Sequence, residues 1–364
     1  MKFLNLVRFA PVNSRVTTTL ATLLAVSALT ACSPTVDKKA VAPDASKPLQ
    51  IGWVTSWASA GQLMQSLNHT NITDLYGMPM VLHGYPTSPE LNEAALHGDI
   101  DCVSNALVPT VSLLSASEDW VVVGRLVDSP LSVVARKGAK IESVRGLKGK
   151  SIGVLFTSGA HPYVLELLAK NDLQIGEGAD KVKLVNLKPG EQASAMQKGS
   201  VDAVAAWEPQ IGILLSKDLG KVINSERHLG VITVRKSIAD SAPDRVVKLL
   251  KSYIQANHYT ATHAKEADQW YTAAAEIDAK VLPFIGVIEP NTKAVKPTDV
   301  HIELQPGDLT LAQTYSDAML KAKLIPAAVN FNSRMNPAFL QKALSELNKD
   351  GYKTDEVREV GEHR

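Results

Sequence analysis

The sequence predicts an α/β protein with two lobes, and two observations lead to this fold class. Short apolar runs, such as residues 50–54 and 120–126, alternate with segments of helical periodicity, which is typical of parallel βαβ units. A further apolar run, residues 131–135, begins directly after the short joint 127–130. We interpret this joint as the point where the chain leaves one sheet and enters another. Two sheets joined in this way predict a hinge and a cleft between them.

The other elements continue this alternation along the chain. The expected first sheet comprises residues 50–54, 80–82, 101–103 and 120–126, and the expected second sheet comprises residues 131–135, 151–156, 183–187 and 201–206. Residues 230–234 predict a last strand, and residues 243–259, 266–282, 309–322 and 337–347 have helical periodicity. We therefore expect residues 49–128 and 228–364 to form lobe 1 and residues 129–227 to form lobe 2.

The composition excludes several functional classes. The chain has 364 residues, of which 45% are apolar and 21% are charged, as in an ordinary soluble globular protein. Lys and Arg total 38 against 37 for Asp and Glu, whereas a nucleic-acid-binding surface needs a clear basic excess. The nine His are scattered without the spacing of a metal site. We therefore expect no nucleic-acid partner, no metal and no cofactor.

The N-terminal residues predict export and a lipid anchor. Basic residues precede an apolar run at 17–29, which is too short to span a bilayer but typical of a signal peptide. The run ends in LTAC, residues 29–32, which resembles the bacterial lipobox, where the chain is cut before the cysteine and the thiol is acylated. We expect a signal peptide at 1–31, lipidation of Cys32, a flexible tether at 32–48 and a periplasmic location with contact to the membrane through lipid alone. An ordinary secretory signal that contains a cysteine is the alternative.

Residues 146–173 have the pattern of a strand, a loop and a helix, and the loop is a candidate ligand site. Residues 151–156 form a short apolar run, and Pro162 suits the first turn of the following helix. The first N–H groups of a helix lack internal partners and attract an anion, and hydroxyl and glycine residues at 157–161 add donors with little bulk. Turn chemistry alone would also place Ser and Gly here, so both interpretations stay open.

Three motifs together resemble one protein family. They are GLKGKSIGV at 146–154, TSGAHPYVLELL at 157–168 and GSVDAVAAWEP at 199–209, and they are similar to the periplasmic substrate-binding proteins of ABC importers in the nitrate, sulfonate, taurine and bicarbonate group. The resemblance implies a two-lobed type II periplasmic-binding-protein fold with a hinge and an interlobe cleft. Such a protein closes on a small ligand and delivers it to an importer permease without chemistry of its own. We expect it to act as a monomer.

The resemblance also implies which residues face the cleft. They are Ser56, Trp57, Tyr85, Thr87, Ser88 and Asn105 from lobe 1, Thr157, Ser158, Gly159, His161, Trp207 and Glu208 from lobe 2, and Asp128 and Ser129 at the hinge. Trp207 could instead pack in the core and Glu208 could be solvated, whereas Glu208 in the cleft would favour a ligand with an amine. His161 at a helix N-terminus is expected to be neutral.

These loops contain no Lys or Arg, so an anion would be held by neutral donors and helix ends. Aromatic and hydroxyl residues favour an organosulfonate with a tail, such as taurine, because nitrate would leave the aromatic residues without a role. A thiamin-pyrimidine precursor is compatible with an aromatic pocket. A ligand-sensing domain stays open as well, because it would use the same closure.

The fold also resembles the pyrimidine synthase of fungal thiamin biosynthesis, which is an enzyme. That resemblance would require a Cys-rich iron site, and the chain has only Cys102 once Cys32 is acylated. Cys102 is expected to be a small buried apolar group without a disulfide. We therefore predict that the protein is not an enzyme.

Overall fold

The computed structural model describes residues 47–156 and 158–361. The predicted signal peptide, the lipidation site Cys32, most of the predicted tether and the candidate ligand residue Thr157 lie outside the described residues. None of the helices in the described part of the chain is long and apolar enough to cross a membrane.

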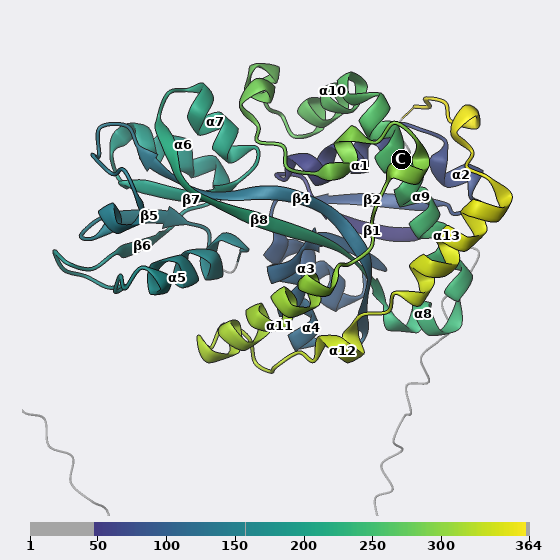
Figure 1. The fold of residues 1–364 in the computed structure, drawn as a ribbon, viewed down its shortest axis with the longest axis horizontal. Coiled ribbons are helices and arrows are strands. Elements are labelled where there is room, and N and C mark those ends of the chain that lie inside the picture. The colour runs from purple at the N-terminus through teal and green to yellow at the C-terminus, as the bar shows by residue number, and fades with distance from the viewer. Residues whose placement is uncertain (1–46, 157, 362–364) are drawn as a thin grey trace, which may run out of the picture. The chain divides into compact units, whose positions relative to one another are not determined.

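One sheet of eight strands organises the described residues, in the order β2-β1-β3-β8-β4-β7-β5-β6 (Figure 1). Two long antiparallel strands, β4 (Trp120–Arg136) and β8 (Gly220–Arg235), pair with each other in its middle. On one side β1 (Leu49–Val54) is parallel to β2 (Met80–Tyr85) and β3 (Cys102–Ala106), and on the other β5 (Ser151–Val154) is parallel to β6 (Lys183–Asn186) and β7 (Ala203–Trp207). The predicted α/β class is confirmed.

The prediction of two separate sheets is wrong. The joint at residues 127–130 stays inside β4, where Ser129 pairs with His228 and Pro130 pairs with Arg227. A register irregularity between Arg125 and Asp128 accommodates the joint, as β-bulges do, and the ladder continues on both sides of it. The two halves of the fold therefore share the two long strands, and the chain crosses between them without leaving the sheet.

Helices cover the sheet on both halves. Those of the first half are α1 (Ala58–Asn68), α2 (Ile72–Leu75), α3 (Ser88–His97) and α4 (Leu107–Ala116), and those of the second half are α5 (Ala160–Lys170), α6 (Pro189–Lys198) and α7 (Gln210–Ser216). The C-terminal helices are α8 (Lys236–Ser241), α9 (Pro243–Thr262), α10 (Ala264–Ala274), α11 (Pro306–Lys321), α12 (Phe331–Arg334) and α13 (Ala338–Asp350). Of the four C-terminal helices predicted, the one at 266–282 is shorter than expected and is followed by a 3-10 turn, η2 (Ala279–Phe284).

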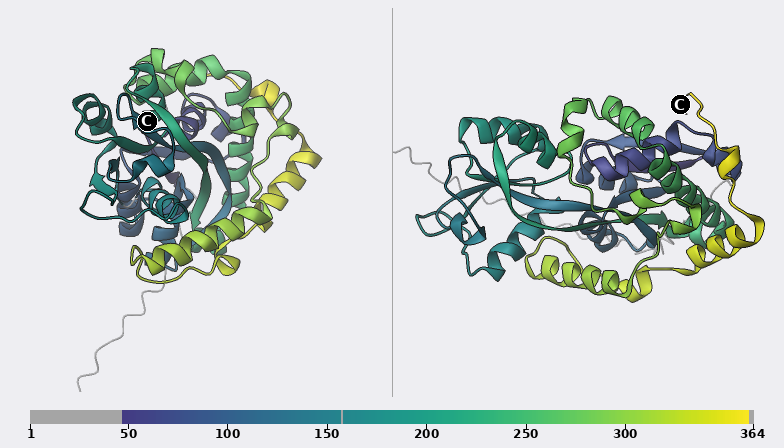
Figure 2. Two further views of the ribbon diagram at one scale, coloured as in Figure 1. Left: turned by 60° about the vertical axis from the view of Figure 1, so that its left-hand side comes forward. Right: turned by 45° about the horizontal axis from the view of Figure 1, so that its top comes forward.

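The C-terminal segment contacts helices of both halves. The η2 turn packs on α7, and α11 contacts α4 of the first half and α5 of the second. Figure 2 shows the two long strands and these C-terminal helices from two further sides. The predicted lobe boundaries, which place all of residues 228–364 in lobe 1, stay a prediction.

The apolar core follows the sheet through both halves. Its largest fully buried side chains include Trp57, Trp120, Tyr253 and Phe331, and a smaller cluster between β7, α6 and α7 surrounds Val204. Cys102 is fully buried in β3 and free, and burial raises the pKa of its thiol. The prediction that Cys102 is a buried apolar group is confirmed, and its thiol is unreactive.

Candidate functional site

A small cavity lies where strands from both halves end. Its lining residues are Val54, Trp57, Ser88, Asn105, Ala106, Pro109, Ser158, Gly159, Trp207 and His228. Val54, Asn105 with Ala106, and Trp207 are at the carboxyl ends of β1, β3 and β7 respectively, where ligands collect in open α/β sheets. The space open to a water-sized molecule is about 10 Å³, which is close to the minimum for one water.

Six of the predicted ligand residues line this cavity. They are Trp57, Ser88, Asn105, Ser158, Gly159 and Trp207. They come from distant parts of the chain and meet because each follows the carboxyl end of a strand or begins the next helix. Their placement makes the cavity the candidate ligand site, while their contact with a ligand stays a prediction.

The two tryptophans form walls that present only carbon to the cavity. The indole N–H of Trp57 donates to the hydroxyl of Ser129 at 2.8 Å, and that of Trp207 donates to the backbone oxygen of Ser56 at 2.8 Å. Both indoles are at least 94% buried, at 2% and 6% exposure. Ser56 and Ser129, predicted to meet the ligand, therefore orient the tryptophans instead and do not line the cavity.

Asn105 offers the cavity a hydrogen-bond donor. Its Oδ1 accepts from the backbone N–H of Ala106 at 2.8 Å and from the hydroxyl of Ser88 at 2.9 Å. Because a backbone N–H can only donate, this contact fixes which side of the amide carries oxygen. The amide nitrogen, Nδ2, is buried and has no partner. Asn105 is thus held with two N–H groups available to a ligand.

Ser158 and Gly159 shape the wall formed by the start of α5. The hydroxyl of Ser158 donates to the carbonyl of Leu155 at 2.6 Å and accepts from the N–H of Ala160 at 3.2 Å, so its proton is already committed within the turn. A Cβ at Gly159 would lie 2.5 Å from Nε2 of His228, so no other residue fits this position without displacing the imidazole. The ligand-loop prediction thus correctly located a cavity wall, but the Ser158 hydroxyl has no proton left to donate.

His228 lines the cavity and was not predicted from the sequence. It is 6% exposed, neither ring nitrogen has a hydrogen-bond partner, and its ring centroid lies 5.3 Å from that of Trp57. Burial lowers the pKa of His228 to about 4. The sequence pattern started the last strand at residue 230, which left His228 in the segment expected before it. His228 lies on β8 where the chain returns from the second half of the fold to the first. This position is the one signal in the sequence that could have identified His228.

His161 does not line the cavity. Its ring stacks on Phe156 with centroids 4.6 Å apart and borders a separate groove of about 400 Å³ formed with α3, α4 and α11. Burial lowers the pKa of His161, in agreement with the expected neutral imidazole. Its Nδ1 has no partner, but it faces a different space from the site predicted for it.

Tyr85 and Thr87 also lie outside the cavity. The carbonyl of Tyr85 accepts from the N–H of Thr55 at 2.9 Å, which ties the end of β2 to the loop after β1. Thr87 precedes α3, and its N–H donates to Glu90 at 3.2 Å. Thr87 lines a shallow pocket of about 370 Å³ that also includes Ser56 and Lys188. These residues therefore organise the loop between β2 and α3.

Glu208 is buried, and its carboxylate has partners within the protein. Its two carboxylate oxygens accept the backbone N–H groups of Gly212 at 2.9 Å and Gly286 at 2.8 Å, and the residue is 1% exposed. Burial raises the pKa of Glu208 to about 7, although both backbone contacts act in the opposite direction. Its carboxylate joins α7 to the segment after η2, and Glu208 is not among the residues that line the cavity, while its contact with a ligand stays a prediction.

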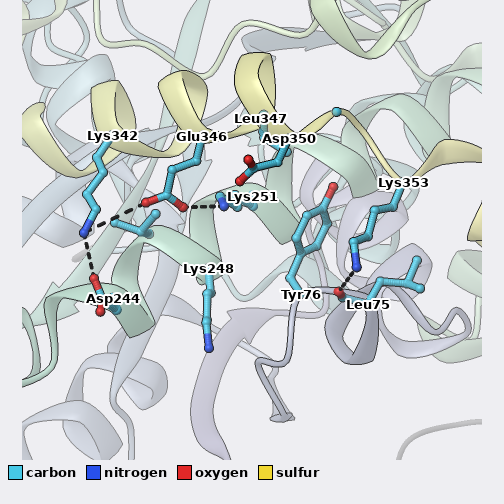
Figure 3. A pocket seen from close by; sticks show the side chains of 12 residues that line it. Leu75, Tyr76, Asp244, Lys248, Lys251, Lys342, Glu346, Leu347, Asp350 and Lys353 are labelled. Atoms are coloured by element: carbon cyan, nitrogen blue, oxygen red, sulfur yellow. Dashed lines mark hydrogen bonds and ion pairs between the residues drawn. The ribbon is translucent and has the colours of Figure 1, made fainter.

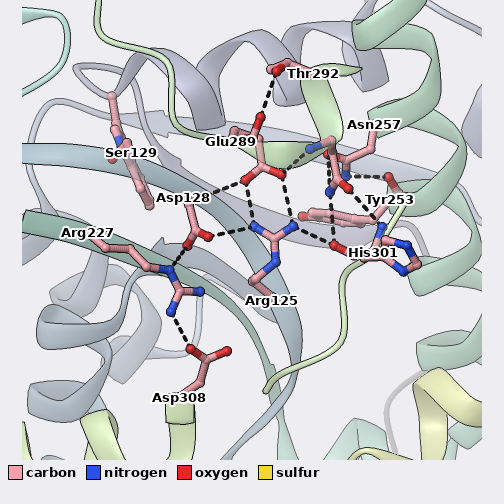
Figure 4. Close-up of polar contacts among 12 residues, drawn as sticks. Arg125, Asp128, Ser129, Arg227, Tyr253, Asn257, Glu289, Thr292, His301 and Asp308 are labelled. Carbon is pink, nitrogen blue, oxygen red and sulfur yellow. Dashed lines mark hydrogen bonds and ion pairs between the residues drawn. The ribbon is translucent and has the colours of Figure 1, made fainter. Parts of the chain in front are cut away.

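Asp128 belongs to a buried charge network rather than to the cavity (Figure 4). Its carboxylate lies 2.8 Å from Nε of Arg227 and 3.5 Å from Nη1 of Arg125. Arg125 makes a two-pronged contact with Glu289 at 2.7 and 3.0 Å, and Arg227 reaches Asp308 at the start of α11 at 2.5 Å. The network fastens β4, β8, α11 and the segment around Glu289 to one another.

A larger pocket of about 450 Å³ lies between α2, α9 and α13 and is unrelated to the strand ends (Figure 3). Lys342 lies 2.7 Å from Asp244, and Lys251 pairs with Glu346. The lining charges largely neutralise one another, so this pocket offers a weak site for a charged ligand. Within residues 47–156 and 158–361, no group of three or more His, Cys, Asp or Glu side chains is arranged to hold a metal ion.

The arrangement of the strands and the position of the cavity are those of a periplasmic-binding-protein fold. Two groups of parallel strands share two long crossing strands, and a cavity lies at the strand ends of both, as in the type II periplasmic-binding-protein fold. The alkanesulfonate-binding protein SsuA of Xanthomonas axonopodis pv. citri, solved with MOPS, is similar with a TM-score of 0.63 and 19% identity over 79% of this chain and 98% of that one. The nitrate-binding protein NrtA of Synechocystis PCC 6803 is similar with a TM-score of 0.62 and 10% identity over 84% and 91% of the two chains.

Sequence comparison assigns the family. The chain belongs to the NMT1-like family, whose profile matches residues 42–275. A protein of Bacillus subtilis named for aliphatic sulfonate binding is 28% identical over 225 residues, which is 60% of this chain and 64% of that protein. The match therefore spans slightly less than two thirds of this relative's length. The predicted resemblance to the sulfonate and nitrate group of substrate-binding proteins is confirmed.

Proposed function

We propose that the protein is a solute-binding protein that captures a small organosulfonate and delivers it to an ABC importer. One observation carries the proposal: the cavity combines two tryptophan faces with the unpartnered amide N–H groups of Asn105. Carbon walls suit an organic tail, and unpartnered donors suit an oxyanion. Relatives and structural neighbours named for sulfonate binding support this ligand class.

The absence of a fixed charge in the cavity limits the ligand's charge. None of its described lining residues is Lys, Arg, Asp or Glu. A multiply charged anion would lose its hydration without a compensating charge, which is costly in a buried site. A sulfonate carries one delocalised negative charge, and taurine adds an amine that is free to remain in solvent at the entrance. The chemistry therefore favours a monoanion or a zwitterion.

Ligand entry requires the cavity to open. A volume of about 10 Å³ excludes any organosulfonate, so the walls must separate to admit the ligand and then enclose it in a cavity larger than the present one. Rotation of residues 129–227 against residues 49–128 and 228–364 about the crossing at Asp128 and Ser129 would separate Trp57 from Trp207. Hinge closure of this kind is a recognised way to enclose a ligand. The protein performs no chemistry on the ligand in this proposal.

The N-terminal residues support the location. Residues 1–31 act as a signal peptide, Cys32 is lipidated, and the folded part remains in the periplasm as a monomer that reaches a permease through its tether. Mass spectrometry of the mature protein should find an acylated N-terminal Cys32. An unmodified Cys32 after signal removal would exclude the lipid anchor and leave a free periplasmic protein.

A thermal-shift screen followed by calorimetry tests the ligand class. Taurine, ethanesulfonate and longer alkanesulfonates should raise the melting temperature, because a ligand that binds only the folded state stabilises it. Trp207→Ala should weaken sulfonate binding without loss of the fold. The control is Trp270→Ala, which removes a tryptophan that stacks on His69 and lies outside the cavity lining.

Nitrate is the second candidate, because it is smaller than an organosulfonate and would require less opening of the cavity. A thermal response to nitrate alone would replace the sulfonate assignment, and a response to thiamin pyrimidines alone would make a pyrimidine precursor the cargo. No response to any of these ligands would contradict import of this group and favour a sensor domain for another molecule.

A further inference from the structure

The hydrogen-bonding capacity of the cavity is almost fully used by the protein itself. The indole N–H groups of Trp57 and Trp207 and the hydroxyl protons of Ser88 and Ser158 all have protein acceptors. Two side chains of the lining remain with unpartnered nitrogen atoms, Asn105 and His228. Buried polar groups are nearly always satisfied, and an orphan in a native fold calls for an explanation.

His228 is the more demanding of the two, because both of its ring nitrogens are buried without a partner. An apolar residue of similar size would fill the same space without this cost of desolvation. The space around it is also shaped to keep the imidazole: Gly159 leaves room for Nε2, and the ring of Trp57 lies beside the imidazole at a tilt of 40°. These contacts describe a built position for an imidazole at the start of α5.

We propose that His228 binds the anionic head group of the ligand and takes up a proton as the ligand enters, so that it supplies the positive charge that the cavity otherwise lacks. This inference rests on the proposed function and assigns the charge partner in that site. Asn105 and the N-terminal turn of α5 would complete the set of donors around the anion. No covalent step is involved, and one proton passes from solvent to the imidazole for each ligand bound.

The electrostatic surroundings of His228 favour this coupling. His228 is approached by Trp57 before α1 and by Gly159 before α5, and it pairs with Ser129 on β4. None of these three residues titrates in the neutral range. The charged groups beside it in the chain and ladder, Arg227 and Asp128, are paired with each other. Burial lowers the pKa of His228 to about 4, so the imidazole is neutral before an anion arrives. A negative charge within about 4–6 Å raises the pKa of a histidine and stabilises its protonated form.

Calorimetry of the full chain in detergent tests the proposal with ethanesulfonate as the ligand. This ligand stays a monoanion across the pH range, so any proton exchange comes from the protein. Titrations at one pH in buffers of different ionisation enthalpy give the number of protons taken up. We expect about one proton per ligand at pH 6, and an affinity that falls about tenfold per pH unit between the pKa of the free imidazole, about 4, and the higher pKa of the bound imidazole, above which the affinity levels off.

Three histidine variants locate the proton. His228→Asn should abolish proton uptake and lower the affinity at pH 6 at least tenfold. His83→Asn is the control, because His83 on β2 contacts Gln50 on β1 and does not line the cavity, so its loss should leave both quantities unchanged. Loss of proton uptake in His161→Asn with retention in His228→Asn would overturn the assignment.

The outcomes separate this inference from the proposed function. Tight binding of ethanesulfonate without proton uptake by the unaltered protein would overturn the role of His228 and leave sulfonate binding intact. Equal affinity of His228→Asn and the unaltered protein would do the same. Failure of ethanesulfonate, taurine and longer alkanesulfonates to bind at all would overturn both the proposed function and this inference.

Discussion

The cavity and the charge network at Arg125 are neighbours on β4 and β8, and the buried cation of the network has several partners whereas the side-chain nitrogen atoms of His228 and Asn105 in the cavity have none. In the network, Arg125 has Glu289, Asp128 and the carbonyl of His301 as partners. In the cavity, His228 and the amide nitrogen of Asn105 have none. A satisfied buried group stabilises a fold, whereas an unsatisfied one lowers stability and remains available to a ligand. The contrast separates residues that hold the crossing together from residues kept for binding.

The largest expected effect comes from breaking the network. Arg125→Ala leaves Glu289 and Asp128 buried without their shared cation, which should lower the free energy of unfolding by about 3–5 kcal/mol. Chemical denaturation measures the change. Arg136→Ala, on the same strand, removes a more exposed pair with Asp202, whose side chains are 26% and 25% exposed, and should cost about 1 kcal/mol or less. Equal losses in the two variants would show that the network is not specially stabilising.

Glu208 provides a pH-dependent test of a satisfied group. Because burial raises its pKa from 4.5 to about 7, the folded protein binds this proton more tightly than the unfolded chain. The contribution of Glu208 to stability should therefore fall as the pH rises from about 4.5 to about 7, by about 3 kcal/mol at most. Denaturation curves of the unaltered protein and Glu208→Gln, compared at pH 5 and pH 8, measure the pH-dependent contribution of Glu208 to the free energy of unfolding. An identical pH dependence in both proteins would contradict it.

Gly159→Ala tests whether the wall of the cavity is shaped around His228. The new Cβ would lie 2.5 Å from Nε2, and the buried imidazole has little room to retreat. We expect a loss of about 1–3 kcal/mol in the free energy of unfolding together with weaker ligand binding. The matched control is Gly190→Ala in α6, where no atom lies within 4 Å of the added carbon. If both alanine variants behave alike, the close approach at Gly159 has no consequence.

The smallest change in the free energy of unfolding is expected at His228, and it is a gain in stability where the other variants lose stability. His228→Leu replaces a buried ring that has two unpartnered nitrogens with an apolar side chain, which should raise the free energy of unfolding by about 1 kcal/mol while binding is lost. Denaturation and calorimetry on the same variant measure the two quantities. A loss of stability above 2 kcal/mol would mean that His228 serves the fold rather than the ligand.

The sequence by itself determined the α/β class and the general position of the candidate site. Apolar alternation identifies strands locally, and the resemblance of short motifs to the family implied that residues such as Trp57, Asn105 and Trp207 face the cleft. Strand patterns and motifs of this kind are encoded within a few neighbouring residues, and the structure places these three residues near the carboxyl ends of strands. Of the thirteen predicted site residues that the structure describes, six line the cavity.

Only the tertiary structure decided how the halves join and which polar groups remain available. The continuity of β4 through residues 127–130 depends on pairing with β8, which is remote in the chain. Trp57 and Ser129 are 72 residues apart, Trp207 and Ser56 are 151 apart, and Arg125 and Glu289 are 164 apart. Local patterns predict which residues can donate or accept hydrogen bonds, but whether a partner is present depends on packing between distant segments. For this reason Glu208 emerged as a structural carboxylate and His228 emerged as the candidate charge partner only once the chain was folded.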